Sequence, residues 1–144
     1  MLLLINTNRM LPPIAPIGLD YIYHAAQQAS LPVEILDLCL ADHPAQTIAA
    51  WLQSRRPRLI GLTLRNVDDC LWPSGKSFHP DLAETIAAVR RHSDAPIVLG
   101  GVGFSIFPRE IMEYLPVEFG IHGDGELSLV ELYKQLTGAR QYEK

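Results

Sequence analysis

The chain has few cysteines and few basic residues, and both shortages exclude classes of protein. Only two of its 144 residues are cysteine, too few for a disulfide scaffold. Cys39 and Cys70 also lie too far apart for a zinc or iron–sulfur motif. Lysine and arginine number 12 against 16 acidic residues, which gives a formal net charge of −4, and no basic stripe marks a nucleic-acid surface. We therefore expect a cytoplasmic protein that binds no nucleic acid.

Long hydrophobic runs are missing as well. The apolar start at residues 1–5 lacks a basic flank and ends at Asn6, so it is too short for a signal peptide or a membrane span. It is typical of a buried first strand, and we expect no membrane association. Hydrophobic residues make up 48% and charged residues 19% of the chain, which is ordinary for one globular domain.

The common phosphate-binding and catalytic patterns are absent. No P-loop is present, and the suggestive Pro-Ser-Gly-Lys-Ser at 73–77 lacks the first glycine of that motif. Residues 101–106, Gly-Val-Gly-Phe-Ser-Ile, lack the third glycine of a dinucleotide fingerprint and follow the fourth predicted strand instead of the first. The five histidines are scattered, and no serine or cysteine has a base within local reach. The sequence predicts no catalytic residue.

Strand and helix patterns alternate from one end of the chain to the other. We predict strands at 2–6, 33–38, 59–64, 96–99 and 117–121, and helices at 16–29, 44–54, 81–92, 108–114 and 126–136. Apolar strands that alternate with helices predict an α/β fold, a doubly wound, Rossmann-like parallel sheet of five strands with helices on both faces. We predict the flavodoxin-like strand order 2-1-3-4-5. The domain spans 1–138, and 139–144 form a C-terminal tail or truncated linker.

Two glycine-rich corners are the most informative local feature. One is Val-Leu-Gly-Gly-Val-Gly at 98–103 and the other is Gly-Asp-Gly-Glu at 123–126. Each follows a predicted strand and precedes a predicted helix, which places both at the carboxyl ends of strands, where open α/β sheets bind ligands. Glycine also removes side chains where a ligand approaches the backbone. Taken alone, the corners fit tight strand-to-helix turns equally well.

Four motifs in fixed order carry a resemblance to a known family. They are Pro-Pro-Ile-Ala-Pro-Ile-Gly-Leu at 12–19, Ile-Gly-Leu-Thr-Leu-Arg-Asn at 60–66, Val-Leu-Gly-Gly at 98–101 and Gly-Asp-Gly-Glu at 123–126. The set resembles the cobalamin-binding N-terminal domain of cobalamin-dependent radical S-adenosylmethionine (SAM) enzymes, over nearly the whole chain. The resemblance implies that the corrin ring lies across the carboxyl ends of the strands. It also implies that the dimethylbenzimidazole nucleotide tail enters a slot beside the sheet.

The resemblance implies a set of cofactor contacts. Thr63 would hydrogen-bond the tail, and Gly100 and Gly101 would clear space for it. The whole implied set is Asn8, Pro12, Thr63, Leu64, Arg65, Asn66, Gly100, Gly101, Val102, Ser105, Gly123, Gly125 and Glu126.

The chain departs from the family pattern in two places. Many cobalamin domains carry Asp-x-His-x-x-Gly after the first strand, whose histidine binds cobalt, but residues 6–13 contain no histidine. The expected cobalamin is therefore bound base-off and without a histidine ligand. The Cys-x-x-x-Cys-x-x-Cys motif of radical enzymes is also absent, so the chain is not catalytically complete by itself. The resemblance then assigns the [4Fe-4S] cluster and S-adenosylmethionine to a separate C-terminal radical SAM domain, for methyl transfer or radical chemistry.

Apolar residues near the predicted ligand edge suggest a docking surface. Residues 10–13, together with Phe104, Ile106 and Phe107, are predicted to meet the catalytic domain or a second copy of the chain. The alternative function is a stand-alone α/β interaction or nucleotide-binding domain whose cofactor pocket is degenerate and empty.

Overall fold

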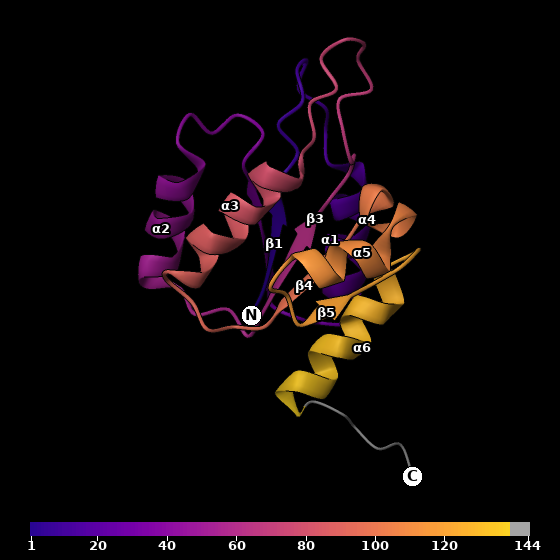
Figure 1. Ribbon diagram of the computed structural model, residues 1–144. Coiled ribbons are helices and arrows are strands. Elements are labelled where there is room, and N and C mark those ends of the chain that lie inside the picture. The colour runs from indigo at the N-terminus through magenta and orange to yellow at the C-terminus, as the bar shows by residue number, and fades with distance from the viewer. Residues whose placement is uncertain (139–144) are drawn as a thin grey trace.

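A parallel sheet of five strands forms the centre of the molecule (Figure 1). The computed structural model describes residues 1–138, so the predicted tail at 139–144 lies outside the described residues. The strands are β1 (Leu2–Asn6), β2 (Val33–Asp37), β3 (Leu59–Thr63), β4 (Ile97–Gly100) and β5 (Phe119–Gly120). Their order is β2-β1-β3-β4-β5, which confirms the predicted topology.

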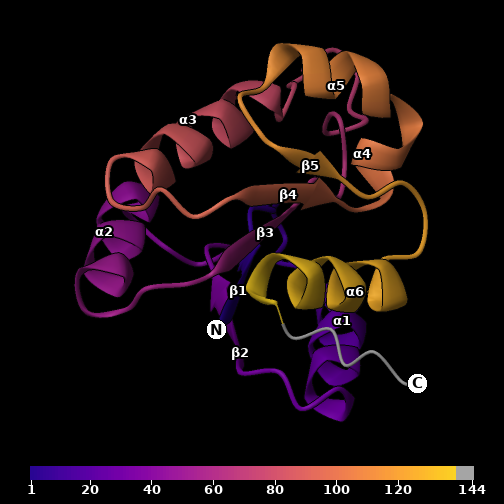
Figure 2. The same cartoon turned by 90° about the horizontal axis from the view of Figure 1, so that it is seen from below.

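Helices cover both faces of the sheet. They are α1 (Ile17–Gln28), α2 (Pro44–Ser54), α3 (His79–Arg90), α4 (Val102–Ile106), α5 (Pro108–Tyr114) and α6 (Glu126–Thr137). Figure 2 shows α1 and α6 side by side on one face, with α2, α3 and α5 on the other. No helix within residues 1–138 is long and apolar enough to cross a membrane.

Alternating side chains of the central strands build two separate cores. Leu2 and Leu4 of β1 pack toward α1 and α6, whereas Leu3 and Ile5 pack toward α2 and α3. Successive side chains of a strand point to opposite faces, so a strand in the middle of a doubly covered sheet is apolar throughout. All five residues of β1 are buried, whereas none of the five residues of β2 is, as expected for a central strand and an edge strand.

The segment after β4 differs from the prediction. The sequence predicts no helix between the strand at 96–99 and the helix at 108–114, but residues 102–106 form α4. Phe104, predicted to lie in an exposed apolar patch, is only 1% exposed and packs in the core beneath α2, α3 and α5; that prediction is wrong. Ile106 and Phe107 remain exposed. The helix turns Phe104 inward because its side chain fills the space under the short strand β5, where it lies against Gly120.

The loops that follow β1 and β3 project beyond the carboxyl edge of the sheet (Figure 1). The long connection after β3 carries an isolated antiparallel bridge between Asp68 and Ser77. The Asp69 carboxylate accepts hydrogen bonds from the Ser74 hydroxyl at 2.6 Å and from the Leu71 N–H at 3.1 Å. The Ser74 hydrogen bond, followed by those from the backbone, lowers the pKa of Asp69 below its ordinary value. These bonds hold the loop in one conformation, with Trp72 exposed at its tip.

Candidate functional site

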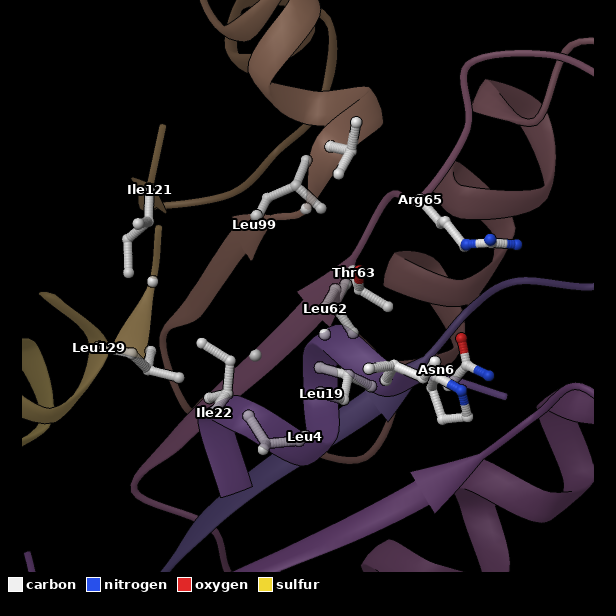
Figure 3. A pocket seen from close by; sticks show the side chains of 18 of the residues that line it. Leu4, Asn6, Leu19, Ile22, Leu62, Thr63, Arg65, Leu99, Ile121 and Leu129 are labelled. Atoms are coloured by element: carbon white, nitrogen blue, oxygen red, sulfur yellow. The ribbon is translucent and has the colours of Figure 1, made fainter. Parts of the chain in front are cut away.

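A cavity of about 430 Å³ lies between the sheet and helices α1 and α6, and it extends to the carboxyl edge (Figure 3). Its lining combines one face of β1, β3 and β4 with the start of α1, the two glycine corners and the first turns of α6. These segments are far apart in the sequence, and the doubly wound topology alone brings them together. We refer to this cavity as the slot.

The floor of the slot has two layers that the strand register defines. At the sheet edge Asn6 pairs with Thr63, and Thr63 pairs with Gly100. Two residues further in, which is roughly 7 Å along a strand, Leu4 pairs with Gly61, and Gly61 pairs with Val98. The outer layer therefore carries an amide and a hydroxyl. The inner layer is hydrocarbon only.

Gly61 creates much of the depth of the slot. It is buried in the middle of β3, and a Cβ at this position would lie 2.9 Å from Leu4 Cδ2 and 3.9 Å from Val98 Cγ1. Gly125 acts in the same way on the wall, where a Cβ would lie 2.9 Å from Ile22 Cδ1. A side chain at either glycine would push Leu4 or Ile22 away from the backbone and into the slot.

The walls of the slot are apolar. Leu19 and Ile22 come from α1, and Leu129 comes from α6. Ile121 closes the side that follows β5 (Figure 3). A flat apolar group that enters from the sheet edge would contact side-chain carbon on every side of the inner layer.

Polar and charged groups gather at the mouth of the slot. Thr63, Arg65, Ser105, Asp124 and Glu126 all line it there. Arg65 is exposed and lies at the outer rim. The mouth is therefore suited to the polar part of a ligand, and the interior to an apolar part.

Ser105 ties the two glycine corners together. Its hydroxyl donates to the Gly101 carbonyl at 3.0 Å and accepts from the Gly123 N–H at 3.0 Å. Gly123 has a φ of +80°, a backbone conformation that favours glycine. The contact fixes the width of the slot mouth between the β4 and β5 corners.

Backbone geometry by itself explains why residue 101 is glycine. Its φ is +101°, and a Cβ there would lie 2.7 Å from both the Leu64 carbonyl oxygen and Thr63 Oγ1. The corner after β4 thus approaches the end of β3 closely, and the Gly103 N–H donates to the Leu64 and Arg65 carbonyls at 2.9 Å each. This close approach also starts α4.

The slot brings together most of the residues that the family resemblance implied. Those that line it are Thr63, Arg65, Gly100, Gly101, Val102, Ser105, Gly123, Gly125 and Glu126. Pro12, Leu64, Asn66 and Asn8 are outside the lining. Leu64 is buried in the core on the opposite face of the sheet, and Pro12 is exposed on the loop after β1.

Asn8 belongs to a buried polar network at the end of β1. The Asn6 amide donates to Asp37 Oδ1 at 2.8 Å, and Asn6 Oδ1 accepts from the Asn8 N–H at 3.1 Å. Asn8 Oδ1 accepts from the Met10 N–H at 3.3 Å, whereas Asn8 Nδ2 is buried without a hydrogen-bond partner. The network orders the first residues of the loop after β1.

The sequence did not indicate a cofactor contact for several lining residues: Leu4, Asn6, Leu19, Ile22, Gly61, Val98, Ile121, Asp124 and Leu129. Gly61 carries a usable signal, because a glycine inside an apolar strand often marks close approach of a ligand or another backbone. The apolar residues carry none, because the same side chains would serve an ordinary core.

The chemistry of the slot is that of binding. No histidine or cysteine occurs among its lining residues, and within residues 1–138 no cluster of three or more histidine, cysteine or acidic side chains is placed to hold a metal ion. The arrangement can enclose an apolar group and contact a polar one at the mouth.

Comparison with known proteins gives a family and several relatives. Residues 5–133 match the family described as the B12 binding domain. The tryptophan 2-C-methyltransferase of Streptomyces laurentii is 35% identical over 142 residues, which is 98% of this chain and 24% of that protein. The chain thus spans about a quarter of the length of this relative.

Solved structures agree with this match. The radical SAM methyltransferase TsrM from Kitasatospora setae, solved with cobalamin and a [4Fe-4S] cluster bound, is 37% identical with a TM-score of 0.92. That match covers 98% of this chain and 25% of TsrM. The cobalamin-dependent radical SAM enzyme OxsB with aqua-cobalamin bound has a TM-score of 0.71 at 20% identity, over 99% of this chain and 19% of OxsB, and this likeness concerns the fold.

Proposed function

The chain belongs to the B12 binding domain family, and on this premise we propose that it binds cobalamin with the nucleotide tail in the slot. The observation that carries the proposal is the slot itself. It is open at the carboxyl edge, apolar inside and polar at its mouth, and it lies where α/β sheets bind ligands. The base at the end of the tail would enter the inner layer, and the ribose and phosphate would remain near the mouth.

The residues present fit this cofactor. Gly61 and Gly125 let the Leu4 and Ile22 side chains lie close against the backbone, since a Cβ at either glycine would lie 2.9 Å from one of them. Gly100 is less crowded, since a Cβ there would meet only the Ile121 carbonyl oxygen at 3.6 Å. A planar base can therefore lie over the sheet between Gly61 and α1. Thr63 Oγ1, one layer further out, is placed to hydrogen-bond the tail.

The lower face of the corrin would have no histidine ligand. The segment between β1 and α1, where many family members carry that histidine, contains none. Arg65 and Asn66 follow β3 at the same edge, and we propose that they lie under or beside the ring, whereas the Leu64 side chain is buried in the opposite core. Bound cobalamin supplies a cobalt centre that can carry a methyl group.

We propose a radical SAM catalytic domain as the partner of this module. Two relatives above 30% identity are methyltransferases, so methyl transfer is the favoured reaction class. Exposed apolar side chains at the edge, such as Leu11, Val102, Ile106 and Phe107, would contact that domain. A second copy of the chain is the other occupant to test, by size-exclusion chromatography. Both cysteines are free thiols, which agrees with a cytoplasmic location.

Retention of hydroxocobalamin tests the proposal. Purified protein is mixed with hydroxocobalamin and desalted, and the visible spectrum is recorded. We expect about one corrinoid per chain, with a spectrum typical of base-off cobalamin. The Gly100→Leu variant should fold, because a Cβ fits at Gly100, but its side chain should fill the slot and abolish retention.

The matched control is Ala50→Leu, which also introduces a leucine, at an exposed position of α2 on the opposite face of the sheet. It should retain cobalamin as the wild type does. Two results would refute the proposal: no retained corrinoid in the wild type at micromolar concentrations, or equal retention by Gly100→Leu.

A further inference from the structure

The inner layer of the slot offers no hydrogen-bonding side chain. We propose that the slot selects among corrinoids by the base at the end of the tail, favouring a methyl-substituted benzimidazole over a purine. The selection would reside in Leu4, Gly61 and Val98 on the floor and in Ile22 and Leu129 on the walls. This inference rests on the proposed function, because it requires that the tail enters the slot.

The polar groups of the inner floor are all engaged. Leu4, Gly61 and Val98 lie within paired strands, so their backbone N–H and C=O groups belong to the sheet ladder. Leu4 is 1% exposed and Val98 is 3% exposed, so water has little access between them. A base at this level would find neither a donor nor an acceptor in the floor.

The nearest polar side chains lie outside the inner layer, or their hydrogen-bonding atoms are already engaged. Thr63 is one layer further out, at the sheet edge. Both amide atoms of Asn6 are engaged, with Asp37 and with the Asn8 N–H. The buried and unpartnered Nδ2 of Asn8 could have served a purine, but Asn8 does not line the slot.

The bases differ in what they require of such a site. Adenine carries an exocyclic amino group and extra ring nitrogens, which lose their water partners on entry. Burial of one such group without a partner weakens binding by at least about tenfold. The two methyl groups of dimethylbenzimidazole instead add apolar contact, and each strengthens binding by about fourfold. The slot should therefore rank dimethylbenzimidazole first, benzimidazole second and adenine last.

Equilibrium dialysis of the 144-residue chain against four corrinoids tests the ranking. Three differ only in the base, which is dimethylbenzimidazole, benzimidazole or adenine, and the fourth is cobinamide, which has no nucleotide tail. Binding is read from corrin absorbance. The free energy of releasing the base from cobalt, measured by pH titration of each free corrinoid, is subtracted. We expect the dissociation constant to rise about fifteenfold from the first base to the second, at least another tenfold to adenine, and further still for cobinamide.

A pair of isosteric variants assigns the selection to the slot. Val98→Thr places a hydroxyl beside Gly61 in the inner layer, and it should narrow the preference for dimethylbenzimidazole over adenine by at least about threefold. Val89→Thr is the control, because it makes the same change at a fully buried position of α3 in the opposite core. It should leave the ratio unchanged. The free energy of releasing the base from cobalt belongs to the free corrinoid, so it cancels when each variant is compared with the wild type.

The outcomes separate this inference from the proposed function. Equal affinity for all three bases, or a preference for adenine, overturns base selection while cobalamin binding stands. Cobinamide binding as tight as cobalamin binding overturns the placement of the tail in the slot. An equal change of the ratio in Val98→Thr and Val89→Thr overturns the assignment to the inner layer. Binding of no corrinoid overturns the proposed function, and this inference with it.

Discussion

Enlargement of Gly61 should close the slot without unfolding the protein. In Gly61→Ala the new methyl would lie 2.9 Å from Leu4 Cδ2, so the end of a flexible side chain must move by a few tenths of an ångström. This strain is offset by the loss of the conformational penalty of glycine in a strand, about 0.5–1 kcal/mol. We expect the free energy of unfolding to change by no more than about 1 kcal/mol.

In Gly61→Leu three further carbons would extend into the slot. Their burial contributes about 2.4 kcal/mol at about 0.8 kcal/mol per carbon, against an overpacking strain of about 1–3 kcal/mol. The variant should therefore stay folded. Its effect on binding should be large, because a bicyclic ring the size of tryptophan buries about 150–250 Å², or about 4–6 kcal/mol at 25 cal/mol per Å². We expect cobalamin affinity to fall about a thousandfold or more.

The assay combines urea unfolding, followed by circular dichroism, with equilibrium dialysis against hydroxocobalamin. Gly120→Ala is the control glycine, because its Cβ would lie 2.5 Å from Phe104 Cζ in the opposite core. It should lower stability by about 1–3 kcal/mol and leave affinity unchanged. The reasoning is refuted if Gly61→Leu unfolds in the absence of denaturant, or if it binds cobalamin as tightly as the wild type.

Three smaller perturbations test the surroundings of the slot. Ser105→Ala removes the acceptor of the Gly123 N–H, so stability measured in urea should fall by about 1 kcal/mol and cobalamin affinity by up to about tenfold. Unchanged affinity would show that binding does not depend on the hydrogen bond between the two glycine corners. Burial acts to raise the pKa of Glu118, but the Ile97 N–H and Arg90 lower it overall. The resulting stabilisation is present above the unfolded value of 4.5 and is lost as pH falls through the lowered folded pKa. Glu118→Gln should flatten this acid dependence, by at most about 1 kcal/mol because the pair is partly exposed; identical acid denaturation curves would contradict it. Asp69→Asn weakens the carboxylate contacts of the loop 66–78 and should speed its proteolysis severalfold; an unchanged cleavage rate would show that other contacts order the loop.

The sheet could be predicted from the sequence because its pattern is local and strong. The runs 2–6 and 59–63 are apolar on both faces, as central parallel strands are, and each strand is followed by a helix or a glycine corner. Periodicity therefore gave the five strands, and the strand order came from the fold class that they define. The last helix, predicted at 126–136, spans Glu126–Thr137, and it ends before Gly138, whose φ is +70°.

Helix α4 could not be predicted, because its cause lies elsewhere in the chain. Residues 102–106 contain a glycine and show no helical period. The helix starts there because the Gly103 N–H finds acceptors in the Leu64 and Arg65 carbonyls. The inner layer of the slot escaped for a related reason. Whether Gly61 and Val98 face α1 or α3 depends on strand register, and a single sequence does not give it.

The slot is difficult to explain as a feature of stability alone. A closed apolar cavity of about 430 Å³ would cost about 10 kcal/mol at 24 cal/mol per Å³, comparable with the whole stability of a small domain. The molecule avoids most of this cost because the slot opens at the sheet edge. A larger side chain at Gly100 would fill it with little strain, since only the Ile121 carbonyl lies within 4 Å of a Cβ there. Glycine at 100 therefore maintains a space that folding does not require, and an occupant with an apolar end is the physical reason to keep it.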